Sequence, residues 1–350
     1  MDNFNNDFTN IFSNETVFIP DEVRVKKGRY NFNVVTFGMF IFGIVAIFFQ
    51  YVLSYILYIV AISYPQIRYA DWLNYVFVLI PMYVFAFPIC SLVFKIAPKA
   101  PERDEKIPKS TLFAFFIMMI PMTLILNIFS IFLADILSDG TATNPINEMV
   151  TEVNIWQVAT VVILAPIVEE IIFRKLLIDR TRQFGEKLAI FFSAFCFGAF
   201  HMKIYQMLYA FAMGLLLAYI YTRSGRIKYT IGIHMIFNFC GSVVPLTVTS
   251  LVSDETFAAL EAGNTAILYT LPTSQVFGFM IYLLYLLVEL GLFIAGIVIF
   301  IYFIVKKKFY FKPATMELPK EKRFSTAFLT IGFLFFFAYC IYGTITNFLA

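Results

Sequence analysis

The sequence predicts an all-α fold, a polytopic transmembrane bundle of about eight or nine helices. Hydrophobic residues make up 60% of the 350-residue chain and charged residues only 14%. A soluble domain averages about 45–50% apolar and about 25% charged residues. Long apolar runs recur along the whole chain, and most reach the roughly 20 residues that a membrane-spanning helix needs. The charged residues gather in the short stretches between those runs.

Nine apolar segments are expected to form the membrane helices. The fifth segment is the shortest, and we expect it to lie in the bundle interior; eight full crossings are therefore the alternative count. Four prolines, Pro81, Pro88, Pro121 and Pro166, fall inside segments, where each is expected to kink its helix, as membrane bundles tolerate. The segments cover residues 34–63, 73–96, 111–136, 155–178, 188–202, 205–222, 229–249, 275–305 and 325–348.

The charges between the segments predict the orientation. Lysines and arginines concentrate in the N-terminal tail and in the stretches 97–110, 174–187, 223–228 and 306–323. The alternate loops at 137–154 and 250–274 contain neither residue type. Because basic loops stay on the cytosolic side, the N-terminus is expected in the cytosol and the C-terminus outside.

The remaining composition excludes several classes of protein. No basic stripe indicates nucleic-acid binding, and the net charge is only +3. The chain starts with an acidic, polar stretch, so no cleavable signal peptide is expected. The four cysteines, Cys90, Cys196, Cys240 and Cys340, all lie in apolar segments and are expected to be reduced packing residues. We divide the chain into a cytosolic tail (1–30), N-terminal membrane helices (31–140), a central membrane region (150–250) and C-terminal membrane helices (255–350).

Two adjacent carboxylates, Glu169 and Glu170, lie inside an apolar segment. Ionisable groups are costly in hydrocarbon and are usually there for function. Glu170 and Arg174 share a helix face at the spacing that favours an ion pair. Glu169 then lacks a local counter-charge, and a desolvated carboxylate is a better base. A charged helix end at the cytosolic surface is the structural alternative.

Both histidines of the chain, His201 and His234, also lie in apolar segments, and Asn238 shares a helix face with His234. Each alone could be an interhelical hydrogen-bonding group. With the helical rise, Glu169 and these three residues lie about 9–21 Å from the nearest cytosolic basic residue. All four can therefore meet in one cavity, which water would reach from the cytosol.

Such a set of side chains suits peptide hydrolysis. A glutamate and a histidine can deprotonate water for attack on a carbonyl, while His and Asn donate to the resulting oxyanion. Alternatively, Glu169, His201 and His234 could bind zinc, with water in the open position. The His-Glu-x-x-His helix of common zinc proteases is absent from the sequence. The cofactor is therefore expected to be either none or zinc.

These residues, in this order, resemble the CAAX prenyl protease and bacteriocin-processing family, also called the Abi or CPBP family. The resemblance covers roughly residues 150–250 and implies a four-helix catalytic core. The matching motifs are Glu169-Glu170-x-x-Phe173-Arg174, Phe197-x-x-x-His201 and His234-x-x-x-Asn238.

The resemblance implies an intramembrane endopeptidase that acts on a membrane-associated or lipidated peptide or protein near the cytosolic leaflet. The family is often labelled metalloprotease, but a metal-free mechanism is equally compatible with these residues. By resemblance, Glu169 is the base, Glu170 and Arg174 support it, His201 assists the water, and His234 and Asn238 hold the oxyanion.

Two other functions remain open from the sequence. One is a catalytically silent scaffold or bacteriocin self-immunity protein, although such a protein need not keep the base. The other is a proton-coupled transporter in which Glu169, Glu170 and a histidine relay protons and which Glu289 would also serve, although no internal repeat is evident. Glu289 lies midway through the 275–305 segment, and its structural alternative is a carboxyl hydrogen-bonded to a neighbouring helix. The Phe-, Asn- and Ile-rich composition favours an AT-rich genome and hence a bacterial cell membrane.

Overall fold

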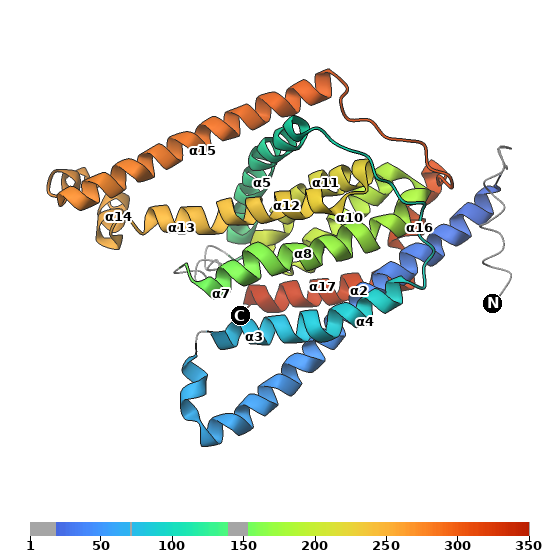
Figure 1. The fold of residues 1–350 in the computed structure, drawn as a ribbon, viewed down its shortest axis with the longest axis horizontal. Helices are drawn as coiled ribbons and strands as arrows, with labels where there is room; N and C mark the ends of the chain where they lie inside the picture. Colours follow the sequence, from blue (N-terminus) through green and yellow to red (C-terminus); the bar gives the residue numbers. More distant parts are fainter. Residues whose placement is uncertain (1–18, 71, 139–152, 350) are drawn as a thin grey trace.

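The computed structural model describes residues 19–70, 72–138 and 153–349. Every regular element within these ranges is a helix, which confirms the all-α class. The helices form a polytopic bundle, from which α15 and the distal half of α2 project (Figure 1). Seven helices in the described ranges are long and apolar enough to cross a membrane. They are Asp21–Ser63, Trp72–Phe94, Lys109–Leu137, Ile204–Ser224, Ile227–Thr249, Thr273–Val305 and Ile331–Leu349.

All nine predicted segments are helical, and several helices extend beyond the apolar run into the charged stretches. The first half of the bundle comprises α2 (Asp21–Ser63), α3 (Trp72–Leu79) and α4 (Phe87–Phe94) joined by a π-helical stretch, α5 (Lys109–Leu137), and α7 (Ile155–Gln157), α8 (Ala165–Glu170) and α9 (Ile178–Thr181) in one continuous run. The second half comprises α10 (Glu186–Phe200), α11 (Ile204–Ser224), α12 (Ile227–Asn238), α13 (Val244–Thr249), α14 (Asp254–Glu261), α15 (Thr273–Val305), α16 (Arg323–Phe328) and α17 (Ile331–Leu349).

Helix α10 lies in the interior, as its short length predicted. It has 15 residues, ten of which are buried. It packs closely against α11, and a Cβ on Gly198 would lie 2.6 Å from the carbonyl oxygen of Met207. Only glycine allows this approach of two backbones. The close contact positions the end of α10, and with it His201, beside the neighbouring helices.

Three prolines mark shifts of helical register. Pro81 lies within the π-helical stretch Ile80–Ala86, Pro166 follows Val158–Leu164, and Pro245 follows Phe239–Val243. Proline has no N–H, so one carbonyl of the preceding turns loses its backbone donor. Short π-helical stretches occur often at functional sites. Pro121, in contrast, lies within α5, which continues through it.

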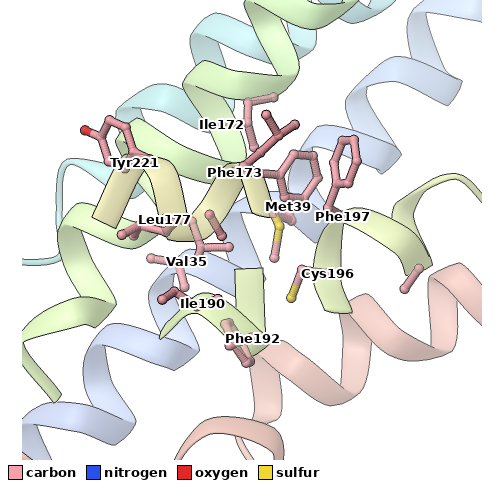
Figure 2. Close-up of a cluster of buried hydrophobic side chains, with 14 of the residues drawn as sticks. Val35, Met39, Ile172, Phe173, Leu177, Ile190, Phe192, Cys196, Phe197 and Tyr221 are labelled. Atoms are coloured by element: carbon pink, nitrogen blue, oxygen red, sulfur yellow. The ribbon is translucent and has the colours of Figure 1, made fainter. Parts of the chain in front are cut away.

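The core consists of aromatic and aliphatic side chains from α2, α10, α11 and the run between α8 and α9 (Figure 2). Phe173, Phe192 and Phe197 are each at most 1% exposed. The rings of Phe173 and Phe197 meet edge to face, with centroids 5.2 Å apart. In lipid, close packing rather than exclusion of water drives such association. This core fixes the helices that carry the polar residues described below.

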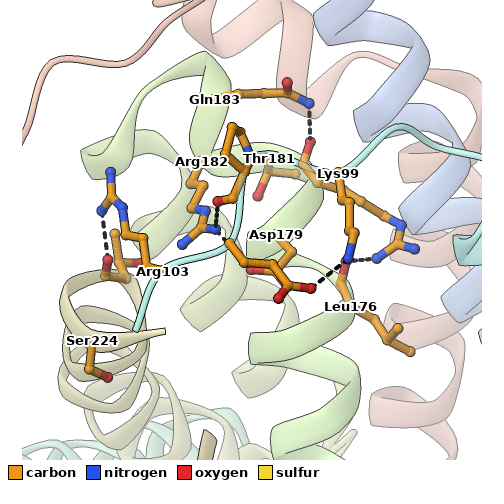
Figure 3. Close-up of polar contacts among 12 residues, drawn as sticks. Lys99, Arg103, Leu176, Asp179, Thr181, Arg182, Gln183 and Ser224 are labelled. Atoms are coloured by element: carbon orange, nitrogen blue, oxygen red, sulfur yellow. Dashed lines mark hydrogen bonds and ion pairs between the residues drawn. The ribbon is translucent and has the colours of Figure 1, made fainter. Parts of the chain in front are cut away.

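The basic stretches meet at one end of the bundle. We call residues 95–108, 178–187, 222–228 and 306–323 together the basic cap. Arg103 pairs with Glu186 at 2.5 Å, and Arg226 pairs with Asp104 at 2.6 Å. Figure 3 shows part of this network around Asp179. The contacts support the predicted grouping of these loops on one side of the membrane; which side they face stays a prediction.

Polar contacts hold the end of the helix run that carries Glu169. Arg182 lies 3.4 Å from Asp179, and burial raises the pKa of Asp179 above its ordinary range. The side-chain amide of Asn31, on α2, donates to the carbonyls of Arg180 at 2.7 Å and Pro98 at 2.9 Å. The end of this helix run is therefore held by α2 and by the 95–108 loop.

Two expectations need correction. Cys90, Cys196 and Cys340 are buried, but Cys240 is exposed, so it is not a packing residue. Glu289 is exposed on α15, and its hydrogen bond comes from the hydroxyl of Tyr285 on the same helix rather than from a neighbouring helix. The spacing of four residues brings both side chains onto one face of α15.

Candidate active site

The polar residues predicted from the sequence lie on α8, the end of α10 and α12. Helix α11 packs against α10 and α12, and the run after α8 packs against α10, α11 and α12. These four segments therefore form one unit. Helix α8 carries Glu169 and Glu170, and the run that follows it carries Arg174. His201 is the C-cap residue of α10, and α12 carries His234 and Asn238.

His234 lies between the two carboxylates. Its Nδ1 is 2.9 Å from Oε1 of Glu170, and its Nε2 is 3.6 Å from Oε2 of Glu169. Glu170 is fully buried and His234 is 1% exposed, whereas 27% of the Glu169 side chain is exposed. A carboxylate accepts, so Nδ1 carries the proton and donates to Glu170. The histidine ring is thereby fixed with Nε2 directed to the second glutamate.

Arg174 is buried without a complete set of hydrogen bonds. Its Nε lies 3.2 Å from Oε2 of Glu170, which makes an ion pair by distance. The angles are not those of a hydrogen bond, and none of its guanidinium nitrogens has a hydrogen-bond partner among the described residues. The guanidinium carbon lies 4.6 Å from the ring centroid of Phe197. Arg174 thus supplies charge to Glu170 and stacks on an aromatic face.

Glu169 and His201 line one cavity of about 170 Å³. Nδ1 of His201 lies 2.8 Å from the carbonyl oxygen of Phe197. Since a carbonyl can only accept, Nδ1 carries the proton and Nε2 is left free as an acceptor in the neutral ring. Apolar side chains form the rest of the lining: Met82, Phe173, Phe197 and Phe200.

Asn238 satisfies a carbonyl that a proline leaves without a donor. The N–H of Ala165 bonds to the carbonyl of Thr160, five residues earlier. In that register the next donor would belong to position 166 and the next acceptor to Val161, but Pro166 has no N–H. The side-chain amide of Asn238 donates to the Val161 carbonyl at 2.8 Å. Neither Asn238 nor His234 is among the residues that line the cavity.

Two residues of the site were not assigned a role by sequence reasoning. The ring of Phe197 packs against both histidines. Its centroid lies 4.9 Å from that of His201 and 5.9 Å from that of His234, in edge-to-face geometry. Its place four residues before His201 was the available signal. Met82 lines the cavity from the π-helical stretch between α3 and α4, far from the motifs, and no pattern in the sequence indicates it.

The predicted zinc set does not fit this geometry. Zinc needs three protein ligands converging at about 2.0–2.3 Å on one point. Within the described ranges, no three His, Cys, Asp or Glu side chains are arranged as a metal-binding group. Nε2 of His234 and Oε2 of Glu169 are 3.6 Å apart, but His201 does not complete a three-ligand group with them. The chemistry below is therefore derived from protein groups alone.

Comparison with protein families identifies the region that carries these residues. Residues 151–240 match the family described as "Type II CAAX prenyl endopeptidase Rce1-like". The matched range contains all six predicted site residues and confirms the resemblance to the CAAX protease family. No curated protein and no solved structure matches the chain. The chain is thus a multi-pass membrane protein that contains a region matching the CAAX protease family.

Proposed function

We propose that the chain is an intramembrane endopeptidase that hydrolyses a peptide bond of a membrane-associated or lipidated substrate near the cytosolic leaflet. The observation that carries the proposal is the position of His234, which contacts the buried Glu170 on one side and the partly exposed Glu169 on the other. Glu169 faces a cavity that it shares with His201. A base, a second histidine and a charged support are thus present in one place.

Glu169 acts as the base. Among the residues that the structure describes, it is the only carboxylate lining the cavity of about 170 Å³, and its side chain is 27% exposed, so it can meet a water molecule there. Neutral His201 presents Nε2 as an acceptor, because its Nδ1 proton is held by the Phe197 carbonyl. Together they can hold a water by both hydrogens, with its lone pair directed at the substrate carbonyl.

His234 stabilises the charge that develops on the substrate oxygen. Because Nδ1 donates to Glu170, the ring can donate from Nε2 only in its doubly protonated form. Glu170 holds the ring through Nδ1, as the buried carboxylate of a catalytic triad orients its histidine. Asn238 uses one amide hydrogen for the Val161 carbonyl, and its second is available to the oxyanion.

The reaction then follows from these roles. Glu169 takes a proton from water, and the hydroxide oxygen bonds to the carbonyl carbon while the carbonyl electrons move to oxygen. The oxyanion accepts hydrogen bonds from His234 and Asn238. When the tetrahedral species collapses, the C–N bond breaks and Glu169 gives its proton to the leaving amine.

The substrate is a peptide or protein chain in or at the bilayer, and nucleic acid is not a partner. The basic cap, with ion pairs such as Arg226–Asp104, is proposed to lie in the cytosol. The N-terminus then also lies in the cytosol, and the host membrane is proposed to be that of a bacterial cell. Apolar cavity walls such as Phe173 and Phe200 suit an apolar residue of the substrate beside the cleaved bond.

Cleavage of a peptide-reporter library by the purified, reconstituted protein tests this function. The wild type and a Glu289→Gln control are expected to generate new termini, and Glu169→Gln is expected to generate none. Glu289 is a matched control because it is a membrane carboxylate on α15, outside the matched region. A library left intact by the wild type would instead favour the catalytically silent scaffold or self-immunity protein.

A further inference from the structure

A second pocket lies within the basic cap, at the opposite end of α10 from His201. It has a volume of about 320 Å³ and is formed by the start of α10 and the 306–323 loop. The 15 residues of α10 separate it from His201 by about 22 Å. It is therefore a site distinct from the catalytic cavity. Its lining residues are Glu186, Lys187, Phe311, Lys312, Pro313, Glu317, Lys320 and Arg323.

The charge of this pocket is positive after its own ion pairs are made. Lining cations outnumber lining carboxylates four to two. Glu186 is neutralised by Arg103 at 2.5 Å, and Glu317 by Arg323 at 2.7 Å. Lys187 and Lys320 are exposed, and no ion pair is found for either in the described part of the chain. Two ammonium groups thus remain for an external anion.

The beginning of α10 adds to this positive potential. The helix starts at Glu186, and its N-cap, Gly185, offers no side-chain acceptor for the first free N–H groups. The N-terminus of a helix carries about half a positive charge and favours anions, phosphates in particular. The positive end of α10 and the two lysines therefore lie at the same place.

The pocket adjoins helices that are long and apolar enough to cross a membrane. Its loop leads from α15 to α16 and on to α17, and both α15 and α17 have that length and composition. Next to it, α16 exposes Phe324 by 64%, and Ile331 at the start of α17 is 69% exposed. Aromatic and aliphatic side chains beside lysines are typical of the membrane interface. Basic pockets in this position recognise anionic headgroups.

We propose that this pocket binds the phosphate of an anionic membrane lipid. The phosphate lies between Lys187 and Lys320 at the start of α10, and the acyl chains run along the apolar side chains of α16 and α17 into the bilayer. The lipid would join the 306–323 loop to α10, the helix that carries His201 at its other end. The proposal concerns binding alone and does not depend on the proposed protease function.

Lipid retention in nanodiscs tests the proposal. Discs contain phosphatidylcholine with a minor share of phosphatidylglycerol, and native mass spectrometry counts the lipids that remain on the released protein. The double variant Lys187→Gln/Lys320→Gln is expected to retain phosphatidylglycerol at least about tenfold less well than the wild type, since each interfacial lysine contributes about 1 kcal/mol. Both lysines are exposed, so folding is expected to be unchanged, as gel filtration checks.

The matched control is Lys306→Gln/Lys322→Gln, which removes the same charge from exposed basic-cap residues that do not line the pocket. It should retain phosphatidylglycerol like the wild type. Equal loss of phosphatidylglycerol in both double variants would show that only surface charge matters, and it would overturn the proposed binding site. Equal retention of phosphatidylcholine and phosphatidylglycerol would also overturn it. Displacement of the lipid by millimolar inorganic phosphate would show a free-anion site and overturn the lipid assignment.

Discussion

His234 donates from Nδ1 to Oε1 of Glu170 over 2.9 Å, in a part of the bundle where both side chains are buried. Glu170 also pairs with the buried Arg174. The carboxylate of Glu170 thus accepts a hydrogen bond from His234 and pairs with the guanidinium of Arg174. The arrangement fixes His234 toward Glu169 and, in the proposed mechanism, toward the oxyanion.

Removal of one partner of this buried group should cost stability as well as activity. Arg174→Ala leaves Glu170 without its cation, and a broken buried pair costs about 3–5 kcal/mol. We expect lower membrane expression, a lower melting temperature and lower cleavage. The double variant Glu170→Gln/Arg174→Met should recover most of the stability, because neither member of the former ion pair keeps a charge, but not the activity. Recovery of activity in the double variant would remove Glu170 from the mechanism.

His201→Ala should lower cleavage with little effect on folding. His201 makes no ion pair in the described part of the chain, and its hydrogen bond is to the backbone carbonyl of Phe197. We expect a loss of about 10²–10⁴-fold, typical for a positioned proton-transfer group. His234→Ala should reduce both activity and melting temperature, since it leaves Glu170 without a donor. Equal melting losses in the two variants would contradict this division of roles.

Asn238 and Pro166 should be coupled in stability but not in catalysis. Asn238→Ala leaves the Val161 carbonyl without its donor, which costs about 1–3 kcal/mol. Pro166→Ala restores a backbone N–H in register with that carbonyl, so Asn238→Ala/Pro166→Ala should melt closer to the wild type. Cleavage should stay low if the amide of Asn238 also binds the oxyanion. Full activity in the double variant would make Asn238 purely structural.

Single cysteines test the orientation of the basic cap. Lys106→Cys and Lys308→Cys should be protected from a membrane-impermeant thiol reagent in intact cells, because basic loops are cytosolic. Asn144→Cys, outside the described residues, should react. The native cysteines must first be replaced, since Cys240 is exposed on its helix. The reverse labelling pattern would put the basic cap outside and change the substrate class without changing the chemistry.

The fold could be predicted largely because hydrocarbon imposes a simple pattern. Nine apolar runs gave nine helical segments, and the short run 188–202 became the interior helix α10. The π-helical stretches could not be predicted, because they depend on hydrogen bonds between a backbone carbonyl and a side chain on another helix. The bond from the Asn238 amide to the Val161 carbonyl is an example. The contribution of Met82 to the cavity also required the tertiary packing of α3 and α4.

The candidate site was predicted as a set of residues but not as a geometry. Spacing placed Glu170 with Arg174, and the structure adds His234 as a second partner of Glu170. The spacing of residues in the sequence could not indicate that Asn238 donates to the Val161 carbonyl, or that the zinc set fails to converge. These features depend on distances between helices, which periodicity within a helix does not contain.

The most direct test of the central claim separates binding from chemistry at Glu169. With a cleaved reporter peptide, the wild type and Glu169→Gln are reconstituted in liposomes, and peptide affinity and turnover are measured on the same preparations. Glutamine keeps the shape but cannot take the proton, so we predict unchanged affinity and turnover reduced by about 10²–10⁴-fold. Turnover of Glu169→Gln within a few fold of the wild type would contradict the assignment of Glu169 as the base.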